Sequence, residues 1–392
     1  MILSVALILL AGLAAGWLCG KIRFPKLFGM ILAGILLGPH GLNLIDASVL
    51  NVSAELRKIA LIVILIRAGL KLSSEDLRRA GRPAVLMCFL PAVCEILGMV
   101  LLGPAILGIS PLEAAILGSV IAAVSPAVVV PRMIRLIDEG YGTEKSIPQM
   151  ILAGASVDDV VVIVLFSTFT GLAKGQSVNA AALAAVPVSV VTGIGFGLLL
   201  GWGLAIFFER ADLRGTMKVM LMLAASFLMV TAEDRLPGLP FASLIAVMAM
   251  GLMIRQKTPG RAARLSARFD RLWVPSEIFL FVLVGASVAV ESALQAGPRA
   301  ILLILLALLF RMAGVWLCLL HTGLSRRERL FCMMAYTPKA TVQAAIGGLP
   351  LAMGLPCGNL VLTVSVIAIL LTAPLGAFAI DGSYRRLLTQ AK

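Results

Sequence analysis

Residues 147–169, IPQMILAGASVDDVVVIVLFSTF, are apolar along most of their length and carry two adjacent carboxylates, Asp158 and Asp159. One carboxylate at the centre of a bilayer costs roughly 2.5–3.5 kcal/mol on insertion scales, and two neighbouring carboxylates also repel each other. Aspartate is ordinary in a turn at a helix end, but Asp158 comes eleven positions after Ile147 and the apolar run continues after Asp159. We therefore expect the pair to lie mid-membrane, in a place where ions or protons are held.

The composition is that of a membrane protein along the whole chain. Apolar residues make up 60% of the 392 residues and charged residues only 14%, and the mean hydropathy is +1.04. Runs long enough to cross a hydrocarbon core of about 30 Å recur from one end to the other. The net charge of +13 does not indicate a nucleic-acid partner, because basic loops follow from the orientation of a protein in the membrane.

These runs predict an all-α polytopic membrane protein with thirteen transmembrane helices. With the N-terminus outside, the cytoplasmic segments hold 25 lysines and arginines and the outer segments hold five, as the positive-inside rule requires. The same orientation puts the C-terminus in the cytoplasm, and we expect the cell inner membrane as the location. The expected spans are residues 2–20, 27–42, 55–72, 83–107, 111–135, 146–171, 179–208, 216–232, 238–254, 272–291, 298–320, 329–351 and 357–380.

Several other classes of site are not expected. The six cysteines lie in or beside apolar runs without ligand spacing, so we predict neither disulfides nor a metal centre, and no cofactor. The first apolar run lacks a preceding basic segment, which favours a first span over a cleaved signal. An intramembrane aspartyl protease needs aspartates on two different helices, one of them in a Gly-x-Gly-Asp motif, and neither feature is present. His40 and His321 lie at span ends, so they offer no Ser/His pair for a serine hydrolase. We therefore do not expect an enzyme.

Charges and helix breaks recur at matching places in the two halves of the chain. Glu95 lies within the fourth expected span and Arg311 within the eleventh, while Pro126 interrupts the fifth span and Pro338 the twelfth. Two inverted repeats on either side of the seventh helix would make these pairs equivalent. Interrupted helices at corresponding positions of two repeats indicate the substrate site of a transporter.

Each polar residue near the breaks has a predicted role. A proline in mid-helix frees carbonyl groups, and half-helix ends carry partial charge, so Lys339 is expected to neutralise the carbonyl ends where the broken helices cross. The hydroxyls of Ser125 and Thr337 would satisfy freed backbone groups or coordinate a cation. Arg311 stays protonated and needs an anion, for which Glu95 is the candidate. That pair either only braces the core or takes part in ion binding.

Three motifs resemble the monovalent cation/proton antiporter superfamily, in particular its NHA-type subgroup, which includes the B-type mammalian sodium/hydrogen exchangers. They are SPAVVVP at 125–131, ASVDD at 155–159 and TPKATVQAA at 337–345. RAGL at 67–70, together with Glu95 and Arg311, fits the same subgroup. The resemblance extends from about residue 25 to residue 380.

The resemblance implies exchange of sodium or lithium for protons by an elevator motion, in a homodimer surrounded by membrane lipid, with a role in pH homeostasis. Asp159 becomes the essential ion- and proton-binding carboxylate and Asp158 its neighbour, the two together binding Na⁺. Lys339 becomes the half-helix neutraliser, and Glu95 and Arg311 a core ion pair. The implied domains are a dimerisation domain (1–72 and 216–291), a core domain (83–171 and 298–380) and a linker helix (179–208).

Two positions depart from related branches, and alternatives remain open. This chain has Ser125-Pro126 where other branches have Thr-Asp-Pro, and Arg311 where several antiporters with paired aspartates have lysine. Arginine does not release its proton, so it is not a proton carrier. Potassium/proton exchange remains possible because ion choice depends on fine cavity geometry. An organic-anion/sodium symporter of related fold would want neutral polar residues at the crossing, not an acidic pair.

Overall fold

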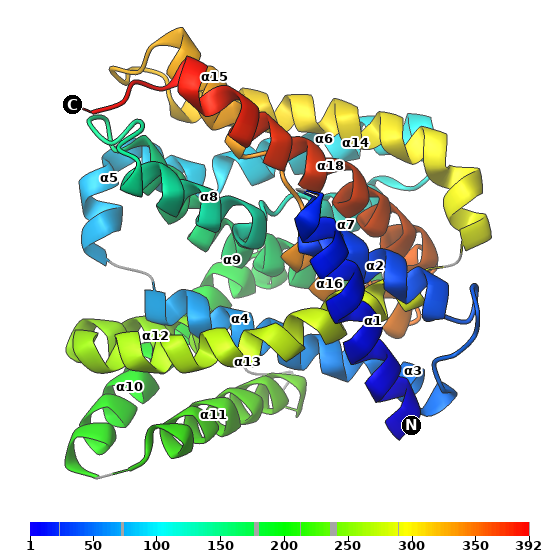
Figure 1. Cartoon of the computed structure of the whole chain (residues 1–392), viewed down its shortest axis with the longest axis horizontal. Helices are drawn as coiled ribbons and strands as arrows, with labels where there is room; N and C mark the ends of the chain where they lie inside the picture. Colours follow the sequence, from blue (N-terminus) through cyan, green and yellow to red (C-terminus); the bar gives the residue numbers. More distant parts are fainter. Residues whose placement is uncertain are drawn as a thin grey trace. The chain divides into compact units, whose positions relative to one another are not determined.

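The computed structural model describes residues 1–22, 24–71, 74–175, 180–211, 213–235, 241–288 and 290–391. Over these residues the regular structure is helical, apart from one isolated antiparallel bridge between Tyr141 and Gln390 (Figure 1). Within the same residues, seven helical stretches are long and apolar enough to cross a membrane. The fold class predicted from the sequence, a helical polytopic membrane protein, is confirmed.

Within the described residues, each expected span overlaps one helix or consecutive helices. Residues 72, 179, 238–240 and 289 of the expected spans lie outside the described residues. The number of membrane crossings stays a prediction. Single helices are α1 (Ile2–Lys21), α2 (Lys26–Leu37), α4 (Ser53–Lys71), α9 (Ile147–Ala173), α10 (Ala180–Arg210), α11 (Gly215–Arg235), α12 (Ser243–Lys257), α13 (Pro259–Ala286), α14 (Val290–Cys318) and α18 (Gly358–Leu387). Interrupted spans are α5 (Ser74–Met87) with α6 (Leu90–Leu107), α7 (Pro111–Ile121) with α8 (Pro126–Asp138), and α15 (Arg326–Ala335) with α16 (Thr341–Ile346) and α17 (Leu349–Ala352). The short helix α3 (Ala47–Asn51) connects two spans.

The break between α5 and α6 was not expected from the sequence. Cys88 and Phe89 leave the helical path, and Pro91 stands at the second position of α6. Proline is tolerated there because the first N–H groups of a helix have no intrahelical acceptor. The run is apolar on both sides of the break, so hydropathy alone gives no sign of it.

The chain divides into two compact units. The first comprises Met1–Arg57, Asp76–Ala173 and Ile278–Lys392, and the second comprises Lys58–Glu75 and Lys174–Glu277. All residues predicted to bind or balance ions belong to the first unit. The division into dimerisation, linker and core domains stays a prediction.

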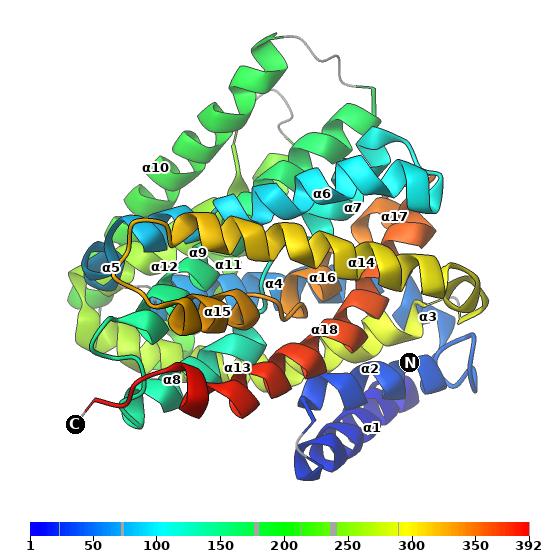
Figure 2. The ribbon, with the colours of Figure 1, turned by 90° about the horizontal axis from the view of Figure 1, so that it is seen from above.

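Within the first unit, α6 and α14 lie side by side (Figure 2). Gly314 on α14 makes this approach possible, because a Cβ atom there would lie only 2.8 Å from Cα of Pro91 on α6. No real Cβ contact with backbone is so short, so any larger residue would push the helices apart. The close packing puts Glu95 on α6 within reach of Arg311 on α14.

At the start of α15, Ser325 and Glu328 form a capping box, and Lys145 Nζ donates to Glu328 Oε2 at 2.8 Å. Burial alone would raise the pKa of Glu328, but the hydrogen bonds from Lys145 and Ser325 outweigh it and lower the pKa. A carboxyl group with a lowered pKa stabilises the folded state above its unfolded pKa, and this stabilisation is lost as the pH falls through the folded pKa.

We therefore expect Glu328→Gln to lower the apparent melting temperature by about 2 °C at pH 7, which corresponds to roughly 0.5–1 kcal/mol. Below the folded pKa, where the wild-type carboxyl is protonated, the two proteins should melt together. Thermal unfolding followed between pH 7 and pH 3 measures the difference. A gap that stayed constant down to pH 3 would show that Glu328 acts only through packing and capping.

Candidate ion-binding site

Two helix interruptions meet in the first unit. Residues 122–125 separate α7 from α8, and residues 336–340 separate α15 from α16. Pro126 takes the first position of α8, where a missing N–H is harmless, and Pro338 lies inside the second unwound stretch. The N–H of Ser125 donates to the carbonyl of Pro338 at 2.8 Å. Backbone of one interruption is thus hydrogen-bonded directly to backbone of the other.

Arg311 is fully buried on α14 and connects the charged residues to both interruptions. Its Nη1 donates to Glu95 Oε2 at 2.9 Å and its Nη2 to Asp158 Oδ2 at 2.8 Å. The same guanidinium also donates to backbone carbonyls, from Nε to Tyr336 at 2.6 Å and from Nη1 to Ala122. The planar fork of five N–H donors allows all four contacts at once. The sequence identified Glu95 as the partner, whereas the structure adds Asp158 and both unwound stretches.

Lys339 is also fully buried, and its side chain contacts Glu95. Its Nζ donates to Glu95 Oε2 at 2.5 Å, and its backbone N–H donates to Thr372 Oγ1 at 2.9 Å. Among the described residues no carbonyl accepts from this Nζ, so neutralisation of the carbonyl ends by its charge stays a prediction. A carboxylate within reach is a stronger acceptor for an ammonium group than a carbonyl. Thr337 Oγ1 donates to the carbonyl of Met334, near the end of α15, at 2.8 Å.

Gln343 on α16 donates hydrogen bonds to backbone carbonyls at the end of α7 and in the unwound stretch that follows it. Its Nε2 donates to the carbonyls of Ile121 and Ala123, at 3.0 and 2.9 Å. The N–H of Val124 in the same stretch donates to Asp158 Oδ2 at 2.8 Å. Together with Arg311, Gln343 satisfies backbone that water would have to satisfy at this depth. An uncharged amide inside an apolar run is the only sign of this role in the sequence.

Several buried oxygens around the interruptions have no hydrogen-bond partner in the structure. They are Asp158 Oδ1, Asp159 Oδ1, Ser125 Oγ, Thr341 Oγ1, Gln343 Oε1 and Glu95 Oε1. Buried polar atoms are rarely left unpaired, and those that are call for an ion or a water. Hydroxyl, amide and carboxylate oxygens are the ligands that hard cations prefer. The set of oxygen donors therefore suits a hard cation.

The charges of the cluster balance without Asp159. Arg311 and Lys339 carry positive charge, and Glu95 and Asp158 accept from them. Among the residues that the structure describes, ion pairs reach Glu95 and Asp158, but none reaches Asp159. Asp159 is 7% exposed, so its charge has neither a partner nor full access to water. Such a carboxylate is stabilised by binding a cation or a proton.

We expect Gln343→Ala to weaken cation binding, because it leaves two carbonyls of the unwound stretch without donors. Each unsatisfied buried group costs about 1–3 kcal/mol, and the stretch that carries Val124 and Ser125 should move. Sodium titration of exchange should show a KM raised about tenfold or more, with a smaller fall in kcat. Ser226→Ala is the control, since it removes a buried hydroxyl that bonds only to its own helix at Met222. An unchanged sodium KM in Gln343→Ala would contradict the positioning role.

The sequence of this chain is similar to known transport proteins. The chain matches the family model "Sodium/hydrogen exchanger, transmembrane" over residues 5–381. Sodium/hydrogen exchanger 9B2 of Homo sapiens is 31% identical over 408 residues, which cover 99% of this chain and 75% of that protein. Sodium/hydrogen exchanger 9B1 of Homo sapiens is 31% identical over 380 residues, which cover 93% and 73%.

A solved structure gives an independent comparison of the fold. The sodium proton antiporter MjNhaP1 from Methanocaldococcus jannaschii superimposes with a TM-score of 0.86 at 21% identity, over 98% of this chain and 97% of that chain. That similarity shows that the two chains share a fold. The resemblance noted in the sequence is confirmed by the family match and the curated relatives. This chain belongs to the sodium/hydrogen exchanger family.

Proposed function

We propose that this protein is a secondary active antiporter that exchanges Na⁺, or Li⁺, for protons, with Asp159 binding the two in turn. The observation that carries the proposal is the unpaired state of Asp159 beside a charge-balanced cluster. When the cation binds, it takes the place of a proton on this carboxylate. When the cation leaves, a proton restores neutrality. Only one of the two ligands is then bound at a time, which is the requirement for obligatory exchange.

The surrounding residues have supporting parts in this proposal. Asp158 Oδ1, Ser125 Oγ and Thr341 Oγ1 are buried oxygens without partners and are available to complete the coordination of the cation. Arg311 and Gln343 fix the unwound backbone, so the oxygens keep their spacing without a cation. Preorganised ligands bind more tightly because less ordering is required on binding.

The proposal includes alternating access by an elevator motion of the core domain, in a homodimer embedded in membrane lipid. Its support is the fold shared with a sodium proton antiporter and the domain organisation that the family resemblance implies. The location proposed is the inner membrane, with the N-terminus outside and the C-terminus in the cytoplasm. The distribution of lysine and arginine supports this orientation.

The experiment that tests the proposal is dequenching of a pH-sensitive dye in everted membrane vesicles. A proton gradient is formed, and NaCl, LiCl and KCl are added in turn. We expect Na⁺ and Li⁺ to dissipate the gradient, and vesicles without the protein to show no response. A response to K⁺ alone would overturn the proposed ion. No response to any of the three would overturn antiport.

We expect the exchange to be electroneutral, with one proton for each sodium ion. Asp158 accepts from Arg311 and from the N–H of Val124, and we propose that this ion pair persists through the cycle. Arg311 does not titrate, and Asp159 alone then changes its proton. Capacitive current recording on proteoliposomes checks this, with the ionophore-loaded membrane as the positive control. A sustained sodium-driven current that changes with membrane potential would exclude the one-for-one cycle.

A further inference from the structure

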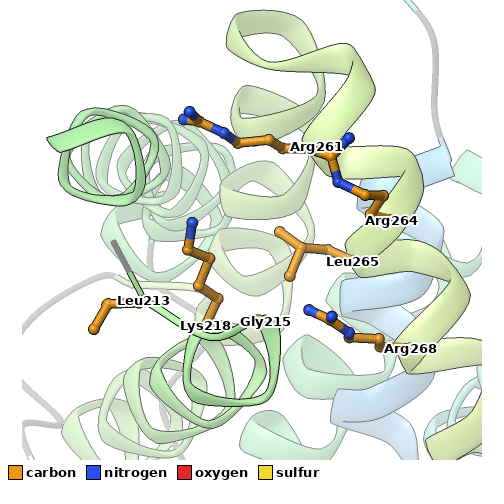
Figure 3. A pocket seen from close by; sticks show the side chains of 7 residues that line it. All are labelled: Leu213, Gly215, Lys218, Arg261, Arg264, Leu265 and Arg268. Atoms are coloured by element: carbon orange, nitrogen blue, oxygen red, sulfur yellow. The ribbon is translucent and has the colours of Figure 1, made fainter. Parts of the chain in front are cut away.

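A second concentration of charge lies in the unit formed by Lys58–Glu75 and Lys174–Glu277. Four cationic side chains line one cavity of about 200 Å³ there, Lys218 from α11 and Arg261, Arg264 and Arg268 from α13 (Figure 3). In the part of the chain that the structure describes, no carboxylate lines this cavity. Loops on the cytoplasmic side are commonly basic, but that rule does not require the charges to converge on one hollow.

The spacing of the arginines explains why they face the same cavity. On α13, positions 264 and 268 follow position 261 by three and by seven residues, so the three arginines lie on one face of that helix. Figure 3 shows Lys218 approaching from the opposite element, toward the space around Leu265. Lys218 belongs to the first turn of α11, where the helix dipole adds partial positive charge. Side chains and helix dipole therefore have the same sign.

The fold does not use all the hydrogen-bond donors of this cluster. Lys218 Nζ donates to the carbonyl of Phe208 at 3.0 Å. Arg261 Nη1 is buried and has no hydrogen-bond partner. It forms an ion pair with Glu209 Oε1 at 3.8 Å, a distance that is too long for a hydrogen bond. A buried guanidinium nitrogen without an acceptor is a donor that an anion in the cavity would satisfy.

Gly215 is the position that lets Arg268 reach the cavity. A Cβ atom at residue 215 would lie 0.9 Å from Nη1 of Arg268, so the guanidinium lies directly against the glycine backbone. Every residue other than glycine would displace it. The first residue of α11 and an arginine of α13 are therefore fitted to each other, which a loop that is merely basic does not need.

We propose that this cavity binds a phosphate group, supplied either by free inorganic phosphate or by the headgroup of a phospholipid. Guanidinium groups match the oxygens of phosphate in geometry and charge. The volume is below the ~300–1,000 Å³ of pockets for drug-sized ligands, which favours a compact anionic group. The predicted orientation places the cavity at the cytoplasmic edge of the membrane, where both sources are present.

The test is thermal unfolding of the purified full-length protein in a neutral detergent. Sodium phosphate is compared with sodium chloride at equal ionic strength and equal sodium concentration. Dioctanoyl phosphatidic acid is compared with dioctanoylglycerol, which lacks the phosphate. We expect a saturable rise in melting temperature with a phosphate-bearing ligand. A response to inorganic phosphate identifies a free-anion site, and a response to phosphatidic acid alone identifies a headgroup site.

Two variants and a matched control distinguish this site from general surface charge. Arg261→Gln/Arg264→Gln should raise the half-saturating ligand concentration about tenfold or more. Gly215→Ala should weaken binding without any change of charge, because it displaces Arg268. Arg210→Gln/Arg214→Gln removes the same charge at two exposed positions outside the cavity, the last residue of α10 and the residue before α11, and should bind as the wild type does. The proposal is overturned if no phosphate-bearing ligand stabilises the protein, or if the control pair weakens binding as much as the cavity pair.

Discussion

We expect Asp159→Asn to abolish sodium-driven proton movement while the protein still folds. The asparagine amide is isosteric with the carboxyl group but binds neither a proton nor a cation by charge. Asp159 has a buried oxygen without a partner, so removing its charge relieves a desolvation cost and does not break an ion pair. We expect the melting temperature to stay the same or rise. Dequenching in everted vesicles measures the activity, and thermal unfolding measures the fold.

A second measurement distinguishes loss of sodium binding from loss of sodium/proton exchange. Sodium should stabilise the wild-type protein against heat by mass action, and this sodium-dependent shift should disappear in Asp159→Asn. Asp46→Asn is the matched control, since Asp46 is the N-cap of α3 and asparagine caps helices about equally well. Normal exchange by the Asp159 variant, or a sodium shift equal to that of the wild type, would remove Asp159 from the site.

Arg311→Ala should be the most destabilising single change in the first unit. It leaves Glu95 with Lys339 as its only ion-pair partner and removes the guanidinium group that pairs with Asp158. The carbonyls of Tyr336 and Ala122 also lose their donor. Breaking a buried ion pair by removing one partner costs about 3–5 kcal/mol, and the lost backbone contacts add to this. We expect little folded protein in detergent, and a melting temperature far below that of the wild type where folded protein is recovered.

Arg311→Lys and a double-mutant cycle show which contacts matter. Lysine keeps the charge but not the fork of donors, so it should recover only part of the stability. Glu95→Ala combined with Arg311→Ala should show coupling, although Asp158 remains unpaired in the double variant. A fully additive cycle would mean that Glu95 is balanced by Lys339 alone. Stability of Arg311→Lys equal to the wild type would show that the backbone contacts contribute little.

Much of the architecture could be read from the sequence because hydrophobic length, charge and proline act locally. The paired aspartates within an apolar run predicted a membrane helix with buried carboxylates, and the structure places both aspartates well inside α9. Pro126 and Pro338 predicted interruptions, since each lacks the N–H that a helix interior needs. The break at Cys88 escaped notice because the run is apolar on both sides of it.

The partners of the charged residues could not be read in the same way, because partners depend on distances between helices far apart in the chain. Glu95 was matched to Arg311 from the symmetry of the two repeats, yet Lys339 shares the same carboxylate oxygen. Gln343 has no charge and so drew no prediction, although its amide reaches two carbonyls more than two hundred residues earlier in the sequence. Sequence patterns indicate which groups need partners, and packing decides which partners they find.

The hydrogen bond from the N–H of Ser125 to the carbonyl of Pro338 has a consequence for how such proteins diverge. Donor and acceptor are both backbone groups, so the bond does not depend on the side chain at either position. At position 125 only proline would delete it, because every other residue has the N–H. The side chains at these two positions can therefore change while this contact between the two interruptions is kept. Geometry of this kind can outlast similarity in sequence, as two chains that are only 21% identical and superimpose with a TM-score of 0.86 illustrate.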